Sequence, residues 1–528
     1  MRKKTPWPLR RRALLRQATA LGALAVLPPL TTGCASDDET EPGPPPRTVF
    51  LHGVASGDPL TDGVILWSRV TSPDGAAVDV DWEIATDLDF ADLVDGGTVT
   101  TDGSRDHTVK LDVTGLSSAT TYYFRFTALS EVSLVGRTRT LPEGSVDRLR
   151  IAFVSCASYC HGYYNAYRHL SRRLDIDLTV HLGDYIYEYA NDEYGSFRQA
   201  DPPHKCVTLE DYRRRYAHQR ADTDLQAVHQ QLPMIAIWDD HETANNSWSG
   251  GADAHYPADG DWEDRKAAGL KAYLEWLPIR EQADGRLQRS FAIGDLVHLI
   301  MVDSRIWGRD EQAVDGDDPI LADDTRSILG ADQEAWLHDE LSAATGRWKL
   351  LGQGVMMGQL PQFLNTDAWD GYPFSRQRLF DHLRAESIND LVVLTGDIHS
   401  SWGQELTDDP FDAAYDPDTG AGAVGVELVG PGITSPGFPE ALGSTADALV
   451  VDNPHLKYAE LVSRGYVVMD IDHDRLQAAY YHMVSIEERG AAEILGGVVE
   501  TATGSHHLVV VDEAVAPPTD VPPGAPVE

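Results

Sequence analysis

An apolar segment at residues 178–182 is followed directly by side chains that can bind metal ions. The segment breaks at Gly183, and Asp184 and Tyr187 come shortly after it. This pattern predicts a buried strand that delivers a carboxylate to a loop at its carboxyl end, where ligands bind in open α/β sheets. An aspartate that bridges two cations, followed by a phenol, suits a binuclear centre with a hard ferric ion. Taken alone, the same stretch fits equally well a core strand that ends in an Asp-capped turn.

Similar side chains follow four other predicted strands. They are Cys156, then Asp240, His241 and Glu242, then Asp303 and Arg305, and finally Asp397 and His399. Any one of them would ordinarily be structural, as a helix N-cap, a hydrogen-bonded histidine or a small buried thiol. Together at one sheet edge, these carboxylate, imidazole, phenolate and thiolate groups favour a binuclear centre. A redox-capable ion would lie near Cys156 and Tyr187, and oxygen-preferring cations would lie near the aspartates.

From residue 148 onward, apolar strands alternate with helical segments. Strands are predicted at 150–156, 178–182, 234–240, 297–303, 349–354 and 391–397, with helices near 165–174 and 209–229. This alternation is typical of layered α/β folds, in which helices cover the sheet faces. Later strands at 466–471 and 476–481 are expected to be antiparallel and to widen the sheet. We therefore predict a layered α/β domain over residues 142–512.

Residues 49–141 have a different, all-β pattern. Short alternating runs at 64–70, 78–84 and 107–113 are separated by Gly, Asp and Pro turns. The stretch 116–126 resembles the fibronectin-type segment that carries a tyrosine corner. The pattern predicts an N-terminal β-sandwich of the fibronectin or immunoglobulin type that precedes the α/β domain and carries no catalytic residues.

The first 34 residues have the features of an export signal. The basic stretch 1–16 contains Arg11 and Arg12 in a pattern close to a twin-arginine motif, and the apolar stretch 18–30 is too short to span a bilayer. Gly33 and Cys34 resemble a lipoprotein processing site. We expect export by the twin-arginine machinery to the periplasm, the cell envelope or the medium, with membrane anchoring through lipidated Cys34 as a further expectation.

Charge and composition narrow the function further. The chain has 528 residues and a formal net charge of −40, which would repel nucleic-acid backbones and anionic membranes, so no specific nucleic-acid binding is expected. A negative protein can still act on phosphate esters where local cations reverse the field. Residues 35–48 are predicted to be an acidic Pro-rich linker, and the Pro-rich tail 513–528 is predicted to be disordered.

Outside the signal, the chain has an odd number of cysteines. These are Cys156, Cys160 and Cys206. In an oxidising compartment an odd number leaves one thiol free or bound to metal. A disulfide between Cys160 and Cys206 is a candidate, with Cys156 as the remaining thiol.

The strand-end motifs resemble those of calcineurin-type metallophosphoesterases. The matching residues are Gly183-Asp184-x-x-Tyr187, Asp240-His241-Glu242 and Gly396-Asp397-x-His399. More specifically, the segments 153–156, 181–188, 237–242 and 394–402 resemble the alkaline phosphatase D (PhoD-like) family, as do 53–59 and 66–69. The resemblance covers roughly residues 49–512. It implies that residues 142–512 are a metallophosphoesterase catalytic domain with a phosphate ester as substrate.

The same resemblance implies a set of metal ligands. A ferric ion, Fe(3+), would be held by Cys156, Asp184, Tyr187 and His399, and a calcium ion, Ca(2+), by Asp184, Asp240 and Asp397. Asp240 stands where the broader superfamily has asparagine, and Asp397 where it has histidine. Carboxylate oxygen in place of nitrogen favours a hard cation such as calcium over zinc.

Two functions remain open at this point. The first is an exported phosphoesterase that hydrolyses phosphate monoesters, diesters or both by attack of metal-activated water. In it His241 would donate a proton to the leaving group, and Arg305 would either fork onto the phosphate or form a salt bridge with a nearby carboxylate. The alternative is a non-catalytic envelope binding module whose metal ions are structural.

Overall fold

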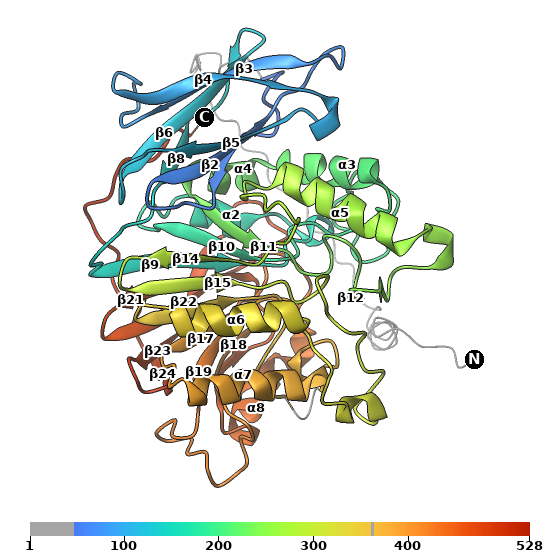
Figure 1. The fold of residues 1–528 in the computed structure, drawn as a ribbon, viewed down its shortest axis with the longest axis vertical. Helices are drawn as coiled ribbons and strands as arrows, with labels where there is room; N and C mark the ends of the chain where they lie inside the picture. Colours follow the sequence, from blue (N-terminus) through green and yellow to red (C-terminus); the bar gives the residue numbers. More distant parts are fainter. Residues whose placement is uncertain (1–46, 361–363, 528) are drawn as a thin grey trace, which may run out of the picture. The chain divides into compact units, whose positions relative to one another are not determined.

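The computed structural model describes residues 47–360 and 364–527 (Figure 1). All of these except Arg47 belong to one unit, Thr48–Glu528. The predicted signal, Cys34 and residues 35–46 of the predicted linker lie outside the described residues. Within the described part of the chain, no helix has the length and hydropathy needed to cross a membrane.

The strand that precedes Asp184 lies inside a ten-stranded mixed sheet. In spatial order the strands are β24 (Leu508–Val511), β23 (Glu493–Ala502), β22 (Arg475–Met483), β21 (Gly465–Asp472), β9 (Arg148–Val154), β10 (Leu178–Leu182), β11 (Met234–Ile237), β1 (Val54–Gly57), β2 (Gly63–Arg69) and β5 (Thr108–Thr114). β9, β10 and β11 are parallel, and Val180 of β10 pairs with Phe153 and Ile235. β21 and β22 are antiparallel and widen the sheet, so this prediction is confirmed.

The remaining predicted strands of the α/β region form a seven-stranded sheet. Its order is β14 (Arg289–Ile293), β15 (Val297–Met301), β16 (Trp348–Gly352), β17 (Leu391–Thr395), β19 (Gly425–Val429), β18 (Ser401–Leu406) and β20 (Leu456–Glu460). β15, β16, β17 and β19 are mutually parallel. Two short strands, β12 (Ser247–Trp248) and β13 (Gly251–Ala252), form a separate hairpin.

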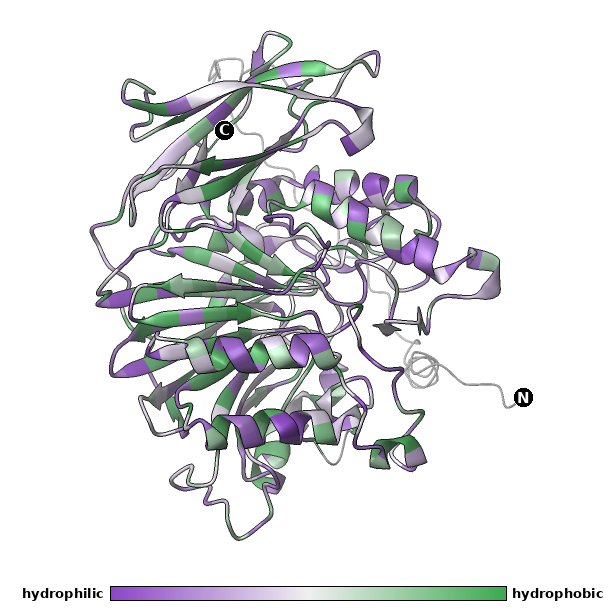
Figure 2. Ribbon diagram, in the orientation of Figure 1, coloured by the Kyte–Doolittle hydropathy of each residue, from purple (hydrophilic) through white to green (hydrophobic). Residues whose placement is uncertain are grey.

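The two large sheets share an apolar core. Leu182 of β10 belongs to the same buried cluster as Leu350 of β16 and Leu394 of β17. The intervening residues of β16 and β17, such as Leu351 and Val393, enter a second cluster with helices α6 (Ala331–Ala343) and α7 (Pro373–Ala385). Figure 2 shows mainly hydrophobic strands and striped hydropathy on α6 and α7, as expected for helices that cover a sheet face. The layered α/β prediction is confirmed as a mixed α/β architecture.

Other helices pack against the ten-stranded sheet. They are α2 (Asn165–Leu170), α3 (Leu209–Arg220), α4 (Thr223–Gln231) and α5 (Trp262–Trp276), while α8 (Ala446–Asp452) adjoins β20. The single helix predicted near 209–229 is therefore two helices. Asp222 has an extended conformation that ends α3, and its carboxylate accepts the backbone N–H of Asp224 as the N-cap of α4.

The N-terminal region contributes strands to two sheets, one of which continues into the α/β region. Its second sheet contains β4 (Leu93–Thr101), β3 (Val78–Ala85), β6 (Thr121–Ala128) and β7 (Glu131–Val132), with β8 (Gly136–Arg139) paired to β6. This sheet shares a buried core with β1, β2 and β5. However, β1 also pairs with β11 of the α/β region, with Gly57 opposite Met234. Residues 49–141 and 142–512 therefore share a sheet.

A tyrosine near the start of β6 supports the predicted relation to fibronectin-type sandwiches. The hydroxyl of Tyr122 accepts the backbone N–H of Ser117 at 2.8 Å, as the tyrosine of a tyrosine corner bonds to the backbone upstream of it. The assignment of this region to the fibronectin or immunoglobulin type stays a prediction.

The predicted disulfide is not formed. Cys156, Cys160 and Cys206 are all free thiols. The Sγ atom of Cys160 lies 3.8 Å from Oδ1 of Asn191, and that of Cys206 lies 3.7 Å from the carbonyl oxygen of Asp211. Each thiol thus has its own polar partner, and the prediction of a bond between Cys160 and Cys206 is wrong.

The Pro-rich tail packs on the fold, contrary to the predicted disorder. The backbone of Ala525 exchanges two hydrogen bonds with the side-chain amide of Gln231, at 2.8 and 2.9 Å. The hydroxyl of Tyr123 donates to the carbonyl oxygen of Pro523 at 2.7 Å, and Gln230 donates to that of Pro526 at 2.9 Å. Composition alone predicts disorder here because the tail has few apolar residues, but its backbone polar groups have partners on α4 and β6.

Removal of the tail should therefore destabilise the protein. Deletion of residues 519–528 loses the hydrogen bonds to Gln230, Gln231 and Tyr123. At about 1 kcal/mol net for each bond, partly offset by the freed chain entropy, we expect a loss of about 1–3 kcal/mol in the free energy of unfolding. Urea unfolding of the full-length and truncated chains measures this difference in the free energy of unfolding. Gln231→Glu should destabilise the full chain and have no effect in the truncated one, and equal stability of both chains would contradict the docked tail.

Candidate metal centre

The predicted site residues come from strands of both large sheets that end at the same edge. Cys156 follows β9, Asp184 and Tyr187 follow β10, and Asp240 follows β11. The loops after β9 and β10 are joined by backbone bonds from Cys156 N to Gly183 O at 3.1 Å and from Ala157 N to Asp184 O at 2.9 Å. The second sheet contributes Asp397 and His399 after β17. Because the parallel strands of both sheets point the same way, their carboxyl-end loops meet.

Four of the predicted ligands have a left-handed backbone, which only glycine adopts without strain. The φ angles are 58° at Cys156, 56° at Asp184, 60° at Asp397 and 58° at His399. Such conformations cost of order 1–3 kcal/mol each and persist only where the surroundings fix them. Glu242 supplies part of this support, because its carboxylate accepts the backbone N–H groups of Asp184, Tyr185 and Asp239 at 3.2, 2.6 and 2.9 Å.

The first predicted ligand set is brought together. Donor atoms of Cys156, Asp184 and His399 lie within 4.8 Å of one another. The hydroxyl of Tyr187 donates to Oδ2 of Asp184 at 2.8 Å and lies 3.2 Å from Nε2 of His399. Nδ1 of His399 faces the carbonyl oxygen of Pro436 at 3.0 Å, so Nδ1 carries the proton and Nε2 presents its lone pair to the site. This backbone anchor is typical of metal-binding histidines.

The residues of the second predicted ligand set fall into two groups that share Asp240. Asp184, Asp240 and His241 form one group of candidate ligands, and Asp239, Asp240 and Asp397 form another. Oδ2 of Asp240 accepts the backbone N–H of Asn246 at 2.6 Å, whereas its Oδ1 is buried without a hydrogen-bond partner. An unpartnered buried carboxylate oxygen is costly in the absence of a cation. The residues present therefore fit a metal ion between Asp240 and its neighbours.

Burial and mutual repulsion make Asp184 and Asp397 hard to ionise, whereas His241 and Arg305 outweigh burial at Asp240 and lower its pKa. Burial, followed by the neighbouring carboxylates Asp240 and Asp239, raises the pKa of Asp184 well above its usual value despite the presence of His241. Burial and Asp239 likewise raise the pKa of Asp397 well above its usual value. Burial also raises the pKa values of Cys156 and Tyr187, with Asp184 as the next contribution. A bound cation removes this penalty, because it favours the ionised form of every ligand around it.

Arg305 forms salt bridges with carboxylates of the site. Its side chain is fully buried, and Nε and Nη2 fork onto Oδ1 and Oδ2 of Asp239 at 2.6 and 2.8 Å. Nη1 donates to Asp367 at 2.7 Å, and Nη2 lies 3.5 Å from Oδ1 of Asp397. The structure thus contains the salt bridge that the sequence left as the other possibility. The partner, Asp239, was missed, although an aspartate pair at a strand end was its visible signal.

His241 has a fixed orientation. Its Nδ1 donates to Oε2 of Glu188 at 2.7 Å, because a carboxylate can only accept, and its Nε2 lies 4.0 Å from Oδ1 of Asp240. Glu188 is fully buried and also accepts the backbone N–H of Asn245 at 2.8 Å. Burial lowers the pKa of His241, but Asp240, Asp184 and Glu188 outweigh it and raise the pKa well above 6.5. These carboxylates therefore favour the protonated form of the ring, which lies beside the candidate metal ligands.

Glu188 and Ser435 are site residues that the sequence did not reveal. Glu188 directly follows Tyr187, where an acid is also common on a loop surface. Ser435 lies far along the chain, yet its Oγ is 2.6 Å from the hydroxyl of Tyr187 and donates to the carbonyl oxygen of Cys156 at 2.8 Å. Two asparagines that follow Asp240-His241-Glu242 shape the loop. The backbone N–H of Asn246 donates to Oδ2 of Asp240, and Oδ1 of Asn245 accepts a hydrogen bond from the hydroxyl of Tyr189.

Comparisons with known proteins agree with this geometry. A family model described as PhoD-like phosphatase matches residues 151–480, and one described as PhoD-like phosphatase, N-terminal domain, matches residues 33–142. Alkaline phosphatase D of Bacillus subtilis (strain 168) is 36% identical over 475 residues, which cover 84% of this chain and 79% of that protein. A solved structure described as "Structure of PhoD" superposes with a TM-score of 0.82 and 34% identity, over 89% of this chain and 94% of the other.

These matches decide between the two functions left open by the sequence. The first family model covers more than half of the chain, and it includes every candidate ligand described above. The chain belongs to the PhoD-like phosphatase family and is a phosphoric ester hydrolase.

Proposed function

We propose that this chain is an exported phosphoesterase that hydrolyses phosphate monoesters, diesters or both with the help of Fe³⁺ and Ca²⁺. One observation carries the proposal: Asp184 belongs both to the group with Cys156 and His399 and to the group with Asp240 and His241. A carboxylate shared between two groups of ligands suits two adjacent cations. Such a pair is the arrangement that stabilises both the attacking and the leaving oxygen of an in-line displacement at phosphorus.

The chemistry of the donor atoms distinguishes the two cations. Cys156, Tyr187 and His399 with Asp184 would hold the ferric ion, because thiolate, phenolate and imidazole suit a redox-capable transition metal. Asp184, Asp240 and Asp397 would hold calcium, because it prefers carboxylate oxygens. When bound, the cations lower the pKa of water and offset negative charge on the phosphoryl oxygens. The raised pKa values of the ligands mean that metal binding releases protons from them.

His241 would donate the proton to the leaving oxygen. Glu188 holds the Nδ1 proton, so Nε2 is the ring nitrogen available to a substrate bound at the metal centre. Glu188 acts as a positioning residue, because it fixes the plane of the ring without reaching the site itself. Arg305 likewise acts through other residues: it holds Asp239 and Asp397 in place, and its donors are directed at carboxylates.

The alternative of a non-catalytic envelope module with structural metal ions has no observation in its favour. The chain is a phosphoric ester hydrolase by family, and the cationic side chain of His241 lies beside the candidate ligands, where a purely structural metal site has no use for a proton donor.

Hydrolysis of nitrophenyl phosphate esters tests the proposed function. We expect the purified protein to release nitrophenol from a monoester or a diester in the presence of calcium, and to lose this activity in excess chelator. Cys156→Ala should lose bound iron together with most of the activity, measured by elemental analysis of the same preparation. Cys206→Ala is the matched control, because it removes a buried thiol outside the ligand groups. A folded, iron-loaded protein without hydrolysis would contradict the proposal.

The proton-donor role predicts a dependence on the leaving group. His241→Gln should lower kcat by about 10²–10⁴ for an alkyl phosphate, whose alkoxide needs a proton, and much less for a nitrophenyl ester. Glu188→Gln should also lower kcat for the alkyl phosphate and the nitrophenyl ester, by a smaller factor than His241→Gln. His204→Gln is the control, because that imidazole is largely exposed and paired with Asp211. Equal losses for both leaving groups would show that His241 binds the phosphate and does not donate a proton.

The export proposal rests on the residues before the described part of the chain. Arg11→Lys with Arg12→Lys keeps the charge but should leave the precursor in the cytoplasm, as judged by cell fractionation. Arg2→Lys with Arg16→Lys is the matched control and should be exported normally. Cys34→Ala should release the exported protein from the membrane fraction. Normal export of the Arg11 and Arg12 variant would contradict export through the twin-arginine motif.

A further inference from the structure

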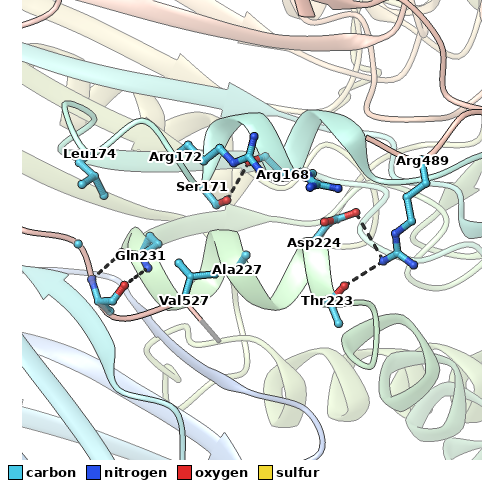
Figure 3. A pocket seen from close by; sticks show the side chains of 12 residues that line it. Arg168, Ser171, Arg172, Leu174, Thr223, Asp224, Ala227, Gln231, Arg489 and Val527 are labelled. Atoms are coloured by element: carbon cyan, nitrogen blue, oxygen red, sulfur yellow. Dashed lines mark hydrogen bonds and ion pairs between the residues drawn. The ribbon is translucent and has the colours of Figure 1, made fainter. Parts of the chain in front are cut away.

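A groove with a volume of about 630 Å³ lies between α2 and α4, away from the candidate metal ligands (Figure 3). None of the residues in the three groups of candidate ligands lines it. α2 follows the carboxyl end of β9, and α4 precedes the amino end of β11. The groove therefore runs over the helix layer on one face of the ten-stranded sheet, and the metal centre lies at the edge of that sheet.

Three arginines line the groove. Arg168 and Arg172 come from α2 and the turn after it, and Arg489 comes from the segment between β22 and β23. Arg489 donates to the hydroxyl of Thr223 at 2.9 Å and lies 3.8 Å from the carboxylate of Asp224. Among the described residues, no carboxylate lies within ion-pair distance of Arg168 or Arg172. Because the chain has 83 acidic and 43 basic residues, two arginines without such a partner on one wall are unexpected.

The segment that carries Arg489 is fixed against α2. The side-chain amide of Asn165 donates to the carbonyl oxygens of Ser485 and Glu488, both at 2.8 Å, and its Oδ1 accepts the backbone N–H of Gly490 at 2.7 Å. These bonds fix the backbone on both sides of Arg489 to α2, the helix that carries Arg168. The N-terminus of α4 does not contribute, because the carboxylate of Asp222 already caps it.

The other end of the groove is apolar. Figure 3 shows Leu174, Ala227 and Val527 at and beside the docked tail, and the arginines farther along the groove. The bonds between Gln231 and Ala525 hold the tail in this position. A ligand that satisfies both ends combines an anionic group with an apolar substituent. Guanidinium groups match phosphate oxygens in particular, because their planar N–H forks can donate two parallel hydrogen bonds.

We propose that the groove is a second, non-catalytic site that binds an organophosphate anion. The phosphate group contacts Arg168, Arg172 and Arg489, and its carbon substituent lies along Leu174 and Ala227. This site goes beyond the proposed function, because it requires neither the metal ions nor hydrolysis. It gives the protein a place to hold a phosphate-bearing molecule on a surface that is otherwise strongly negative.

Calorimetric titration with butylphosphonate, whose carbon–phosphorus bond resists phosphoesterases, tests the proposal on the full-length protein. We expect two classes of binding site in the wild type. Arg168→Gln with Arg172→Gln should weaken one class by about ten-fold or more, the effect of losing charge-assisted hydrogen bonds. Arg105→Gln with Arg384→Gln is the matched control, because it removes the same charge from arginines that are paired elsewhere. All variants should hydrolyse nitrophenyl phosphate at the wild-type rate.

A second comparison tests the apolar end. Butylphosphonate should bind the groove more tightly than methylphosphonate or inorganic phosphate, and Leu174→Ser should remove this difference without changing hydrolysis. Binding that the Arg168 and Arg172 substitutions leave unchanged in every class of sites overturns the proposal, whether the wild type shows one class or two. Equal affinity for the three probes overturns the organic part of it. A protein without phosphoesterase activity could still bind at the groove, so the failures of the two proposals are distinguishable.

Discussion

Asp184, Asp239 and Asp240 are buried and Asp397 is half-buried where the two large sheets end, in two groups of candidate ligands that share Asp240. The rest of the site offsets the free-energy cost of holding these carboxylates together. Burial raises the pKa of Asp239 to about 6 even though a guanidinium is forked onto it. Arg305 and the protonated ring of His241 place at most two positive charges beside these four carboxylates, and they lower the pKa of Asp240 despite its burial. The pKa values of Asp184 and Asp397 stay well above the usual range, so bound cations would supply the positive charge that keeps these two ionised at neutral pH.

The scaffold stores strain to keep these groups in place. Cys156, Asp184, Asp397 and His399 all have a left-handed backbone just after the end of a strand, a conformation that persists only where the surroundings fix it. The compensation comes from buried carboxylates that bind no metal. Glu242 accepts three backbone N–H groups from two of the loops. Some acidic residues near the strand ends are thus candidate metal ligands, and others, such as Glu242, hold the loops in place. The sequence alone does not distinguish the two roles.

The sequence predicted which side chains meet at the sheet edge, because strand ends are local features. An apolar run followed by an aspartate marks a strand end whatever the rest of the chain does, and parallel strands bring such ends together. It left Arg305 undecided, because its partners Asp239 and Asp367 depend on which loops meet. It separated the N-terminal region at residue 141 because the pairing of Gly57 with Met234 joins segments that are distant in sequence. The docked tail was missed for a related reason: its bonds use backbone groups, which composition does not reveal.

The placement of Arg305 bears on how a strongly negative protein attracts a negative substrate. A guanidinium that forks onto Asp239 and reaches Asp367 has its donors directed at carboxylates, so it cannot also receive a phosphate without breaking a buried ion pair, which costs several kcal/mol. Under the proposed function, the attraction at this sheet edge would come from bound cations and from His241, whose Nδ1 is held by Glu188. Substrate affinity and metal occupancy are consequently one property of this site: the same positive charge that keeps the buried aspartates ionised also draws the phosphate group to them.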